Sequence, residues 1–499
     1  MEDTQMSTTL YMLGYIAWLL KDLIRSSSIF SVLSFADTVE NLLTVLFFAL
    51  MLLALAQKPL TEREFLLSLA VIGLALVSYT RNHYFYVISS AVCVISCRNI
   101  DLKRVIKASY RLKAAWIAFH LTAYIIVYIA RPSLIRFDYR DGTGAMRHYF
   151  FLSQANTAAM LLAWTIIEFV YVNWDRLRIR DFLGLWVLFF IYNCFTDSRT
   201  SVVTLTVFLL LCALCKTGRI HERALRGFTR WGYAACSVLF PALAYGYLFL
   251  GQSFHAFFTV LDTLLTGRLL YGSFGLDQYG LTVLGQPITW AGIVYWKGYW
   301  IDQVVFDNAY LYFAVALGII WLIVLSFSFF RVEKYLTVTE CILVTIYILF
   351  AITENYTVDV VYCFPMLFVS RLIFGMDGAG AEALYAAEEA PSETEPTLLP
   401  EAGVVREKER KPEPGIVRAR SISNELADLL PKQEKAAGPG KLRAETRRIR
   451  SEIRAEMKKA DREKLSSDDA DHAARWRTEA ETEKENEEWL AKWRLQRHE

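Results

Sequence analysis

Residues 1–375 consist largely of apolar runs of about 15–25 residues, and these runs constrain the fold more than any other feature of the chain. A helix needs about 20 consecutive apolar residues to cross the ~30 Å of hydrocarbon in a bilayer. The runs lack the alternation of membrane β-barrel strands and exceed their length, so we expect each run to be a helix. With an apolar and aromatic content of 55%, the sequence predicts an all-α polytopic membrane protein.

The pattern predicts about twelve membrane-spanning helices. Their approximate cores are residues 9–24, 36–56, 65–79, 84–97, 114–130, 152–172, 182–195, 201–215, 231–250, 308–330, 339–353 and 357–375. Lys and Arg gather in every second loop, which marks those loops as cytoplasmic. The basic segments are residues 97–113, 173–181, 215–230 and 331–334. We therefore expect both termini in the cytoplasm and four informative loops outside, at residues 131–151, 196–200, 251–307 and 354–356.

The last quarter of the chain, residues 376–499, differs from the rest and holds about half of all Asp, Glu, Lys and Arg. Residues 376–440 are rich in Ala, Glu, Pro and Gly, and this composition predicts a disordered linker. Residues 441–499 are strong helix formers with charges at i,i+3 and i,i+4 spacing, which predicts an exposed, charged cytoplasmic helix. The formal net charge of +2 averages these unlike parts and indicates no nucleic-acid partner.

The segment TDSRTS, residues 196–201, places Asp197, Ser198 and Arg199 between two apolar runs, on the predicted outer side. An outward arginine is the exception to the positive-inside pattern. Two interpretations are open. Arg199 could extend to lipid headgroups or pair with Asp197 to stabilise a tight turn, or it could hold an anionic substrate.

Other outward loops repeat this theme. Arg268 lies in a nearly apolar stretch of the loop 251–307, where a lone guanidinium requires an anion partner. That loop is also rich in aromatic residues such as Tyr279, which suit either membrane anchoring or contact with sugar faces. The loop 131–151 adds arginines that include Arg131 and Arg147, and Asn156 follows it.

The loop 251–307 ends where the chain re-enters the membrane, at Asp307, Asn308 and Tyr310. Asp and Asn are both favoured as helix N-caps, and a polar group on a rigid helix start could also serve a reaction. Both roles are compatible. The outward loops contain no cluster of His, Asp and Cys, so we expect no metal and no other cofactor.

Several of these residues belong to motifs that resemble the O-antigen polymerase and O-antigen ligase family of bacterial membrane glycosyltransferases. The motifs are the S-R pair at Ser198–Arg199, L-x-x-x-L-T-G-R-L at Leu261–Leu269, Y-G-L-T-V-L-G-Q at Tyr279–Gln286, D-N-A-Y-L at Asp307–Leu311, and the later Gly318. The resemblance covers most of residues 36–375. The ligase branch typically has a His near the D-N position, which this chain lacks, so the chain resembles the polymerase branch more closely. Nothing in the family accounts for the charged tail.

The resemblance implies a GT-C-like fold in the bacterial cytoplasmic membrane and the polymerisation of oligosaccharide repeat units carried on a polyprenyl diphosphate. The product would be a capsular polysaccharide, an exopolysaccharide or an O-antigen. Guanidinium groups suit the diphosphate leaving group because they are always charged and bind phosphate oxygens in pairs. The candidate catalytic residues are Arg199, Arg268 and the general base Asp307, with Asp197, Asp277 and Glu354 as alternative bases. The candidate substrate-binding residues are Arg147, Arg131, Asp197, Ser198, Asn156, Tyr279, Asn308 and Tyr310.

Three other functions remain open. The chain could transfer a glycan from the lipid carrier to another acceptor, as a ligase does. Its helices also fit a non-enzymatic transporter, although the sequence shows no internal repeat and places most polar groups in outward loops. The tail could recruit other polysaccharide-assembly proteins.

Overall fold

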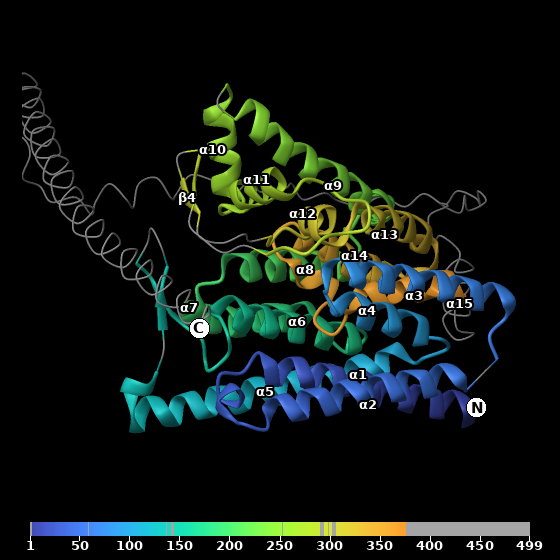
Figure 1. Cartoon of the computed structure of the whole chain (residues 1–499). Helices are drawn as coiled ribbons and strands as arrows, with labels where there is room; N and C mark the ends of the chain where they lie inside the picture. Colours follow the sequence, from blue (N-terminus) through green and yellow to red (C-terminus); the bar gives the residue numbers. More distant parts are fainter. Residues whose placement is uncertain are drawn as a thin grey trace, which may run out of the picture. The chain divides into compact units, whose positions relative to one another are not determined.

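The computed structural model describes residues 2–57, 59–135, 137–140, 144–251, 253–289, 294–297, 299–301 and 306–375. The two parts predicted for the tail, residues 376–440 and 441–499, lie outside these residues. The described chain is mostly helical, as the apolar runs predict (Figure 1).

The first eight α-helices are α1 (Glu2–Arg25), α2 (Ala36–Ala56), α3 (Glu62–Asn82), α4 (Tyr86–Ser96), α5 (Leu102–Ala130), α6 (Ala155–Val172), α7 (Ile179–Thr196) and α8 (Arg199–Lys216). The remaining α-helices are α9 (Glu222–Leu250), α10 (His255–Leu264), α11 (Arg268–Tyr279), α12 (Ala309–Tyr312), α13 (Ile319–Val332), α14 (Val338–Ala351) and α15 (Ser370–Phe374). Short 3-10 helices are η1 (Phe30–Val32), η2 (Pro132–Leu134), η4 (Glu333–Tyr335), η5 (Asn355–Val358) and η6 (Phe364–Val369), and η3 (Phe313–Leu317) is a π-helix. Two antiparallel hairpins pair β1 (Phe137–Tyr139) with β2 (Met146–His148) and β3 (Val294–Trp296) with β4 (Tyr299–Ile301).

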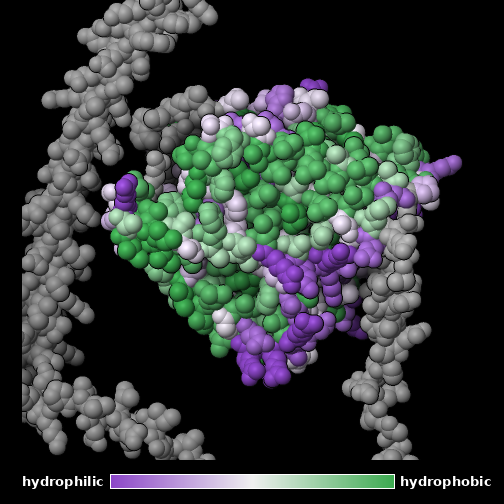
Figure 2. All heavy atoms as spheres, turned by 90° about the horizontal axis from the view of Figure 1, so that it is seen from below, coloured by the Kyte–Doolittle hydropathy of each residue, from purple (hydrophilic) through white to green (hydrophobic). Residues whose placement is uncertain are grey.

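Seven helices within the described residues are long and apolar enough to cross a membrane, by length and composition. They are α2, α3, α5, α6, α7, α8 and α9. All of them except the mostly buried α6 carry large exposed apolar side chains, and α2 alone exposes Leu42, Val45, Leu46, Leu52 and Leu53. In Figure 2 one whole face is predominantly hydrophobic, with hydrophilic residues gathered at one side. Such a continuous apolar surface fits contact with lipid and marks a multi-pass membrane protein.

The other predicted spans correspond to helical segments that are less regular than the apolar pattern suggested. The run 9–24 lies in α1, 84–97 in the short α4, and 339–353 in the 14-residue α14. The run 357–375 is not one helix, because it contains η5, a turn at Asp359, and then η6 and α15. Its composition predicted a span, but the structure breaks the segment into short pieces that pack inside the protein.

Capping side chains explain where several helices begin on the predicted cytoplasmic side. Thr61 and Thr337 each form a capping box, with Glu64 and Glu340 respectively. The Asp101 side chain accepts a hydrogen bond from the Arg104 amide at the start of α5. These side chains satisfy backbone N–H groups that have no partner in the first turn of a helix.

The predicted span 308–330 is interrupted at Gly318, whose φ of 104° is incompatible with a continuous helix. The chain passes from α12 through η3 to Gly318 and then begins α13. The extended segment 282–286 of the outward loop hydrogen-bonds to the interruption. Backbone bonds join Gln286 N to Ala316 O at 3.1 Å and Ile319 N to Thr282 O at 2.8 Å. Non-helical backbone within a membrane-spanning region needs such partners, because lipid supplies none.

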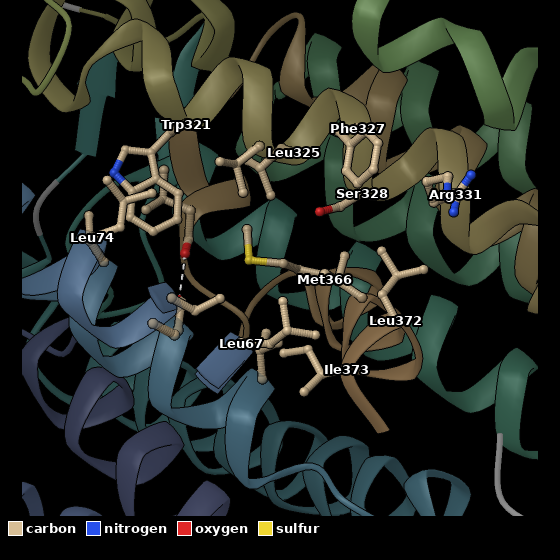
Figure 3. Close-up of a pocket in the computed structure, with 18 of the residues that line it drawn as sticks. Leu67, Leu74, Trp321, Leu325, Phe327, Ser328, Arg331, Met366, Leu372 and Ile373 are labelled. Carbon is tan, nitrogen blue, oxygen red and sulfur yellow. Dashed lines mark hydrogen bonds between the residues drawn. The ribbon is translucent and has the colours of Figure 1, made fainter. Parts of the chain in front are cut away.

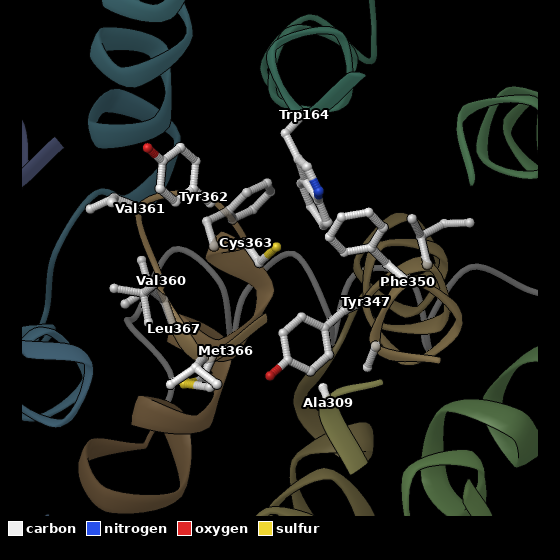
Figure 4. Close-up of a cluster of buried hydrophobic side chains, with 14 of the residues drawn as sticks. Trp164, Ala309, Tyr347, Phe350, Val360, Val361, Tyr362, Cys363, Met366 and Leu367 are labelled. Carbon is white, nitrogen blue, oxygen red and sulfur yellow. The ribbon is translucent and has the colours of Figure 1, made fainter. Parts of the chain in front are cut away.

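The helices enclose two notable interior regions. A cavity of about 400 Å³ lies between α3, α4, α13 and the η6–α15 segment (Figure 3). Beside it, aromatic and aliphatic side chains of α6, α14 and residues 360–367 point toward one another and form a packed core (Figure 4). Tyr347, Leu367 and Val360 in this core are fully buried. The core fixes α14 and the turn that follows it, which supplies part of the candidate site.

Candidate active site

The TDSRTS segment forms the turn between α7 and α8. Asp197 adopts the left-handed conformation with φ of 46° and ends α7, so the chain reverses within two residues. The buried Ser198 stabilises the turn, because its amide donates to Asn193 Oδ1 at 2.9 Å and its hydroxyl donates to Ser201 at 3.1 Å. Arg199 is then the first residue of α8, and its side chain is exposed.

Arg268 is placed by a second tight turn, between α10 and α11. Thr266 and Gly267 both have positive φ, and Asp262 Oδ1 accepts hydrogen bonds from Leu269 N at 3.0 Å and Leu270 N at 2.9 Å. The Asp262 carboxylate therefore caps the start of α11. The L-T-G-R-L sequence folds so that Arg268, like Arg199, is the first residue of its helix.

The Arg268 side chain is only 9% exposed and contacts three other segments. Its Nε donates to the Thr353 carbonyl at 2.6 Å, and Nη2 donates to Glu354 Oε1 at 3.1 Å. Nη2 also lies 3.6 Å from Asp307 Oδ2 and donates to Thr200 Oγ1 at 3.4 Å. Two carboxyl groups, those of Asp307 and Glu354, thus supply the acidic partners that the sequence predicted for Arg268. The contact with Thr200 brings the start of α11 to the start of α8.

The two carboxylates have different surroundings. Glu354, in the turn after α14, has a side chain that is 9% exposed, and burial raises its pKa to about 8 even though the Arg268 charge acts in the opposite direction. The Asp307 side chain remains 40% exposed. Partial removal of the Asp307 carboxyl group from water raises its pKa above the ordinary value, and the nearby Arg268 charge opposes that rise. Asp307 is therefore accessible to an incoming group, whereas Glu354 lies behind Arg268.

Two further arginines come from the β1–β2 hairpin. Arg140 Nε lies 2.9 Å from Asp197 Oδ2, and its Nη2 donates to the Asp197 carbonyl at 2.6 Å. Arg147 donates to the Thr196 carbonyl at 3.1 Å and to Asn156 Oδ1 at 2.6 Å. Asn156 lies in the first turn of α6, so Arg147 joins the hairpin to both α6 and the α7–α8 turn.

Arg140, Arg147, Arg199 and Arg268 form one cluster of positive charge, which we call the arginine cluster. Burial lowers the pKa of Arg140 and Asp197 raises it, while the charges of Arg147, Arg199 and Arg268 lower it further. Contacts place the four side chains around one turn, because Arg140 bonds to Asp197, Arg147 to the Thr196 carbonyl and Arg268 to Thr200, and Arg199 lies between them in the chain. Like charges assembled in this way stabilise an anion bound among them.

The structure unites some predicted residues and separates others. Seven of the predicted residues belong to the arginine cluster or contact it, as described above. They are Arg147, Arg199 and Arg268 within the cluster, and Asp197, Ser198, Asn156 and Asp307 beside it. Arg131 ends α5 with an exposed side chain, and within the described residues no contact places it in the cluster. Tyr279 donates to the Thr289 carbonyl at 2.6 Å, inside its own loop.

Asn308 and Tyr310 have structural roles. The buried Asn308 caps α12 by accepting from the Leu311 amide at 3.0 Å, and its side-chain amide donates to the Ile352 carbonyl at 2.8 Å. Tyr310 is fully buried, stacks on Phe240 and donates to the Ile348 carbonyl at 2.9 Å. These contacts tie α12 to α14, which places Asp307 beside Glu354.

One of the interpretations left open for Arg199 was an ion pair with Asp197. Asp197 pairs with Arg140, and no ion pair joins it to Arg199 within the described residues. The left-handed turn at Asp197 explains this, because Arg199 begins a new helix while Asp197 ends the previous one. Arg140 was visible in the sequence only as one of several outward arginines, and nothing in the sequence distinguished it from Arg131.

The interior also contains charged groups that the sequence pattern did not reveal. Lys113 Nζ lies 2.5 Å from Glu168 Oε1 and donates to the Val361 carbonyl at 2.6 Å, with both side chains fully buried. Asp22 and Asp359 are buried as well. The polar groups of the chain are therefore not confined to the outward loops.

Neither a metal site nor a known relative can be assigned. Within the described residues no group of three or more His, Cys, Asp or Glu side chains could hold a metal ion. Comparisons of the chain with protein-family models, with curated proteins and with solved structures gave no significant match in any of the three.

Proposed function

We propose that this chain is a glycosyltransferase that polymerises polyprenyl-diphosphate-linked oligosaccharide repeat units on the outer face of the bacterial cytoplasmic membrane. In this proposal about twelve segments span the membrane, both termini are cytoplasmic, and the arginine cluster faces outward. The observation that carries the proposal is the assembly of Arg140, Arg147, Arg199 and Arg268 beside two carboxylates.

The arginine cluster suits the glycosyl donor, which is the oligosaccharide linked to polyprenyl diphosphate. When the bond between sugar and diphosphate breaks, negative charge grows on the diphosphate, and fixed guanidinium groups stabilise that charge. Arg199 is exposed and has no ion-pair partner within the described residues, so it is free to contact a phosphate. The start of α8 adds the partial positive charge of a helix N-terminus, whereas the start of α11 is already capped by Asp262.

The carboxyl groups of Asp307 and Glu354 suit the glycosyl acceptor, which is a sugar hydroxyl. An attacking sugar hydroxyl must lose a proton, and the accessible Asp307 is placed to accept it beside Arg268. Glu354 lies behind Arg268, and its role in the proposal is to hold the guanidinium in position. A Glu354 that is largely neutral at pH 7 leaves the positive charge of Arg268 available to the donor.

The test is a reconstituted elongation assay with lipid-linked oligosaccharide, comparing wild type with Arg199→Lys and Arg268→Ala. We expect a ladder of products in wild type and a loss of about 100-fold or more in each variant, in the range seen when one group that stabilises transition-state charge is removed. The matched control is Arg81→Ala, which removes an exposed arginine at the end of α3 on the same predicted side. Elongation that survives both cluster variants, or that is lost equally in the control, would contradict the proposal.

A transporter is the second candidate, and two observations favour it. Discontinuous helices such as α12–α13 and buried ion pairs such as Lys113–Glu168 occur along substrate pathways of secondary transporters. The same vesicles separate the two functions. A transporter would move lipid-linked oligosaccharide or its soluble glycan across the membrane without a longer product, whereas a polymerase would form new glycosidic bonds.

A further inference from the structure

The cavity between α3, α4, α13 and the η6–α15 segment is distant in sequence from the arginine cluster and has no part in the proposed reaction. Most of its lining is apolar and comes from residues such as Leu67, Leu74, Leu325, Met366 and Ile373 (Figure 3). Its volume of about 400 Å³ is large enough for part of a small apolar ligand.

The charges of the cavity lie at one end. Arg63 is in the first turn of α3, Arg331 is in the last turn of α13, and Lys334 follows in η4. Leu74 and Trp321 line the opposite end, and Figure 3 shows them far from Arg331 along the cavity. Residues 331–334 are one of the segments predicted to be cytoplasmic. Residues 57–64, between the predicted spans 36–56 and 65–79, lie on the same side by the alternation of loops, so the charged end of the cavity faces the cytoplasm in this prediction.

These three cations are available to an anion. Within the described residues no ion pair involves Arg63, Arg331 or Lys334. Two of the neighbouring carboxylates are already bound, because Glu64 pairs with Arg98 at 3.0 Å and Glu333 pairs with Arg226 at 3.1 Å, while Glu62 is exposed and forms no ion pair with Arg63 within the described residues. Arg331 and Lys334 each lie near an aromatic ring, at 5.7 Å from the ring centre of Phe327 and 4.6 Å from that of Tyr335.

We propose that this cavity binds an anionic phospholipid of the cytoplasmic leaflet, with one acyl chain along the apolar lining and the phosphate at the Arg63, Arg331 and Lys334 end. An apolar groove with cations at its cytoplasmic mouth matches a lipid in both shape and charge. Basic pockets between membrane helices on this side bind anionic headgroups, and each buried CH₂ adds to the binding. This inference does not depend on the proposed reaction.

The experiment uses the full chain in nanodiscs and measures quenching of Trp321, which lines the deep end of the cavity. The probes are phosphatidylglycerol and phosphatidylcholine with brominated acyl chains, each diluted into unlabelled phosphatidylcholine. The part of the quenching due to Trp321 is the part that Trp321→Phe removes. We expect brominated phosphatidylglycerol to quench Trp321 at a mole fraction about tenfold lower than brominated phosphatidylcholine.

Two kinds of variant test the two halves of the site. A triple variant, Arg63→Gln with Arg331→Gln and Lys334→Gln, should raise the required mole fraction of phosphatidylglycerol to that of phosphatidylcholine. The control triple, Lys103→Gln with Arg104→Gln and Lys107→Gln, removes the same charge from the exposed start of α5 and should leave the preference unchanged. Ser328→Phe fills the cavity without changing any charge, and it should abolish quenching by both lipids.

Several results would overturn the inference. Equal quenching of wild type by both lipids would mean that Trp321 senses ordinary boundary lipid. If the variant lacking Arg63, Arg331 and Lys334 still preferred phosphatidylglycerol, these three cations would not be the headgroup site. Quenching unaffected by Ser328→Phe would place the acyl chain elsewhere, even if the triple variant failed to fold. If soluble glycerol phosphate fully abolished the quenching of Trp321 by brominated phosphatidylglycerol, the cavity would be a site for small anions and not for a lipid.

Discussion

Arg268 shows how one side chain can join several segments. Its guanidinium contacts the turn before α11, the start of α8, Asp307 and the turn after α14. A planar fork of donors makes this possible, and a lysine ammonium could not satisfy the same set of acceptors. At the residue scale the candidate site is therefore a property of contacts among residues that are distant in the chain.

The raised pKa of Glu354 predicts a pH dependence of activity. Below about pH 8 the Glu354 carboxyl group is mainly neutral. Above that pH its negative charge lies 3.1 Å from Arg268 and offsets the guanidinium charge on which the proposed reaction depends. We expect the elongation rate to fall as pH rises through about 8 in wild type and not to fall there in Glu354→Gln. Rates measured between pH 6 and 9.5 check this.

The matched control for that measurement is Asp138→Asn, which neutralises an exposed carboxylate on β1. It should retain the alkaline decline of the wild type. If Glu354→Gln kept the same decline, another group would be responsible and the role assigned to Glu354 would be wrong.

At the scale of elements, the interruption at Gly318 depends on two backbones that approach closely. A Cβ on Gly318 would lie 2.4 Å from the Val283 carbonyl oxygen, and the φ of 104° is strained for any other residue. Gly285 faces Gly318 across this contact, where a Cβ would lie 2.6 Å from the Ala316 carbonyl. The two motifs that contain these glycines are thus packed against each other.

We expect Gly318→Ala to lower the free energy of unfolding by about 2 kcal/mol or more, because the backbone must shift and lose hydrogen bonds to segment 282–286. Thermal unfolding in detergent measures the effect as a lower Tm. Gly73→Ala in α3 is the control, because nothing lies within 4 Å of its added Cβ and alanine favours a helix. A Tm for Gly318→Ala equal to that of Gly73→Ala would show that the contact is not needed.

For the whole molecule, the buried Lys113–Glu168 pair joins α5, α6 and the Val361 carbonyl in the interior. Breaking a buried pair on one side leaves an unpaired charge and destabilises a protein by about 3–5 kcal/mol. We expect Lys113→Met and Glu168→Met each to lower the Tm strongly, and the double variant to recover most of the loss. A double variant that is as unstable as the sum of the singles would show that the two groups act independently.

The sequence alone determined the class of fold and the position of most helices. The predicted run 36–56 matches α2, and the runs 182–195 and 201–215 lie within α7 and α8. These features were predictable because length and apolarity are local properties, and lipid rejects any unpaired backbone. The sequence also drew attention to Arg199 and Arg268, because arginines in outward loops are exceptions to the positive-inside pattern, whereas Asp307 was chosen through the family resemblance. The roles of all three stay predictions.

Only the tertiary structure decided which of these residues meet. It paired Asp197 with Arg140, placed Glu354 behind Arg268, and assigned Asn308 and Tyr310 to packing. It also interrupted the run 308–330 at Gly318 and buried Lys113 against Glu168. Apolar periodicity does not predict these contacts, because each joins segments that are far apart in the chain. The energy of each contact depends on the partner that folding brings to it.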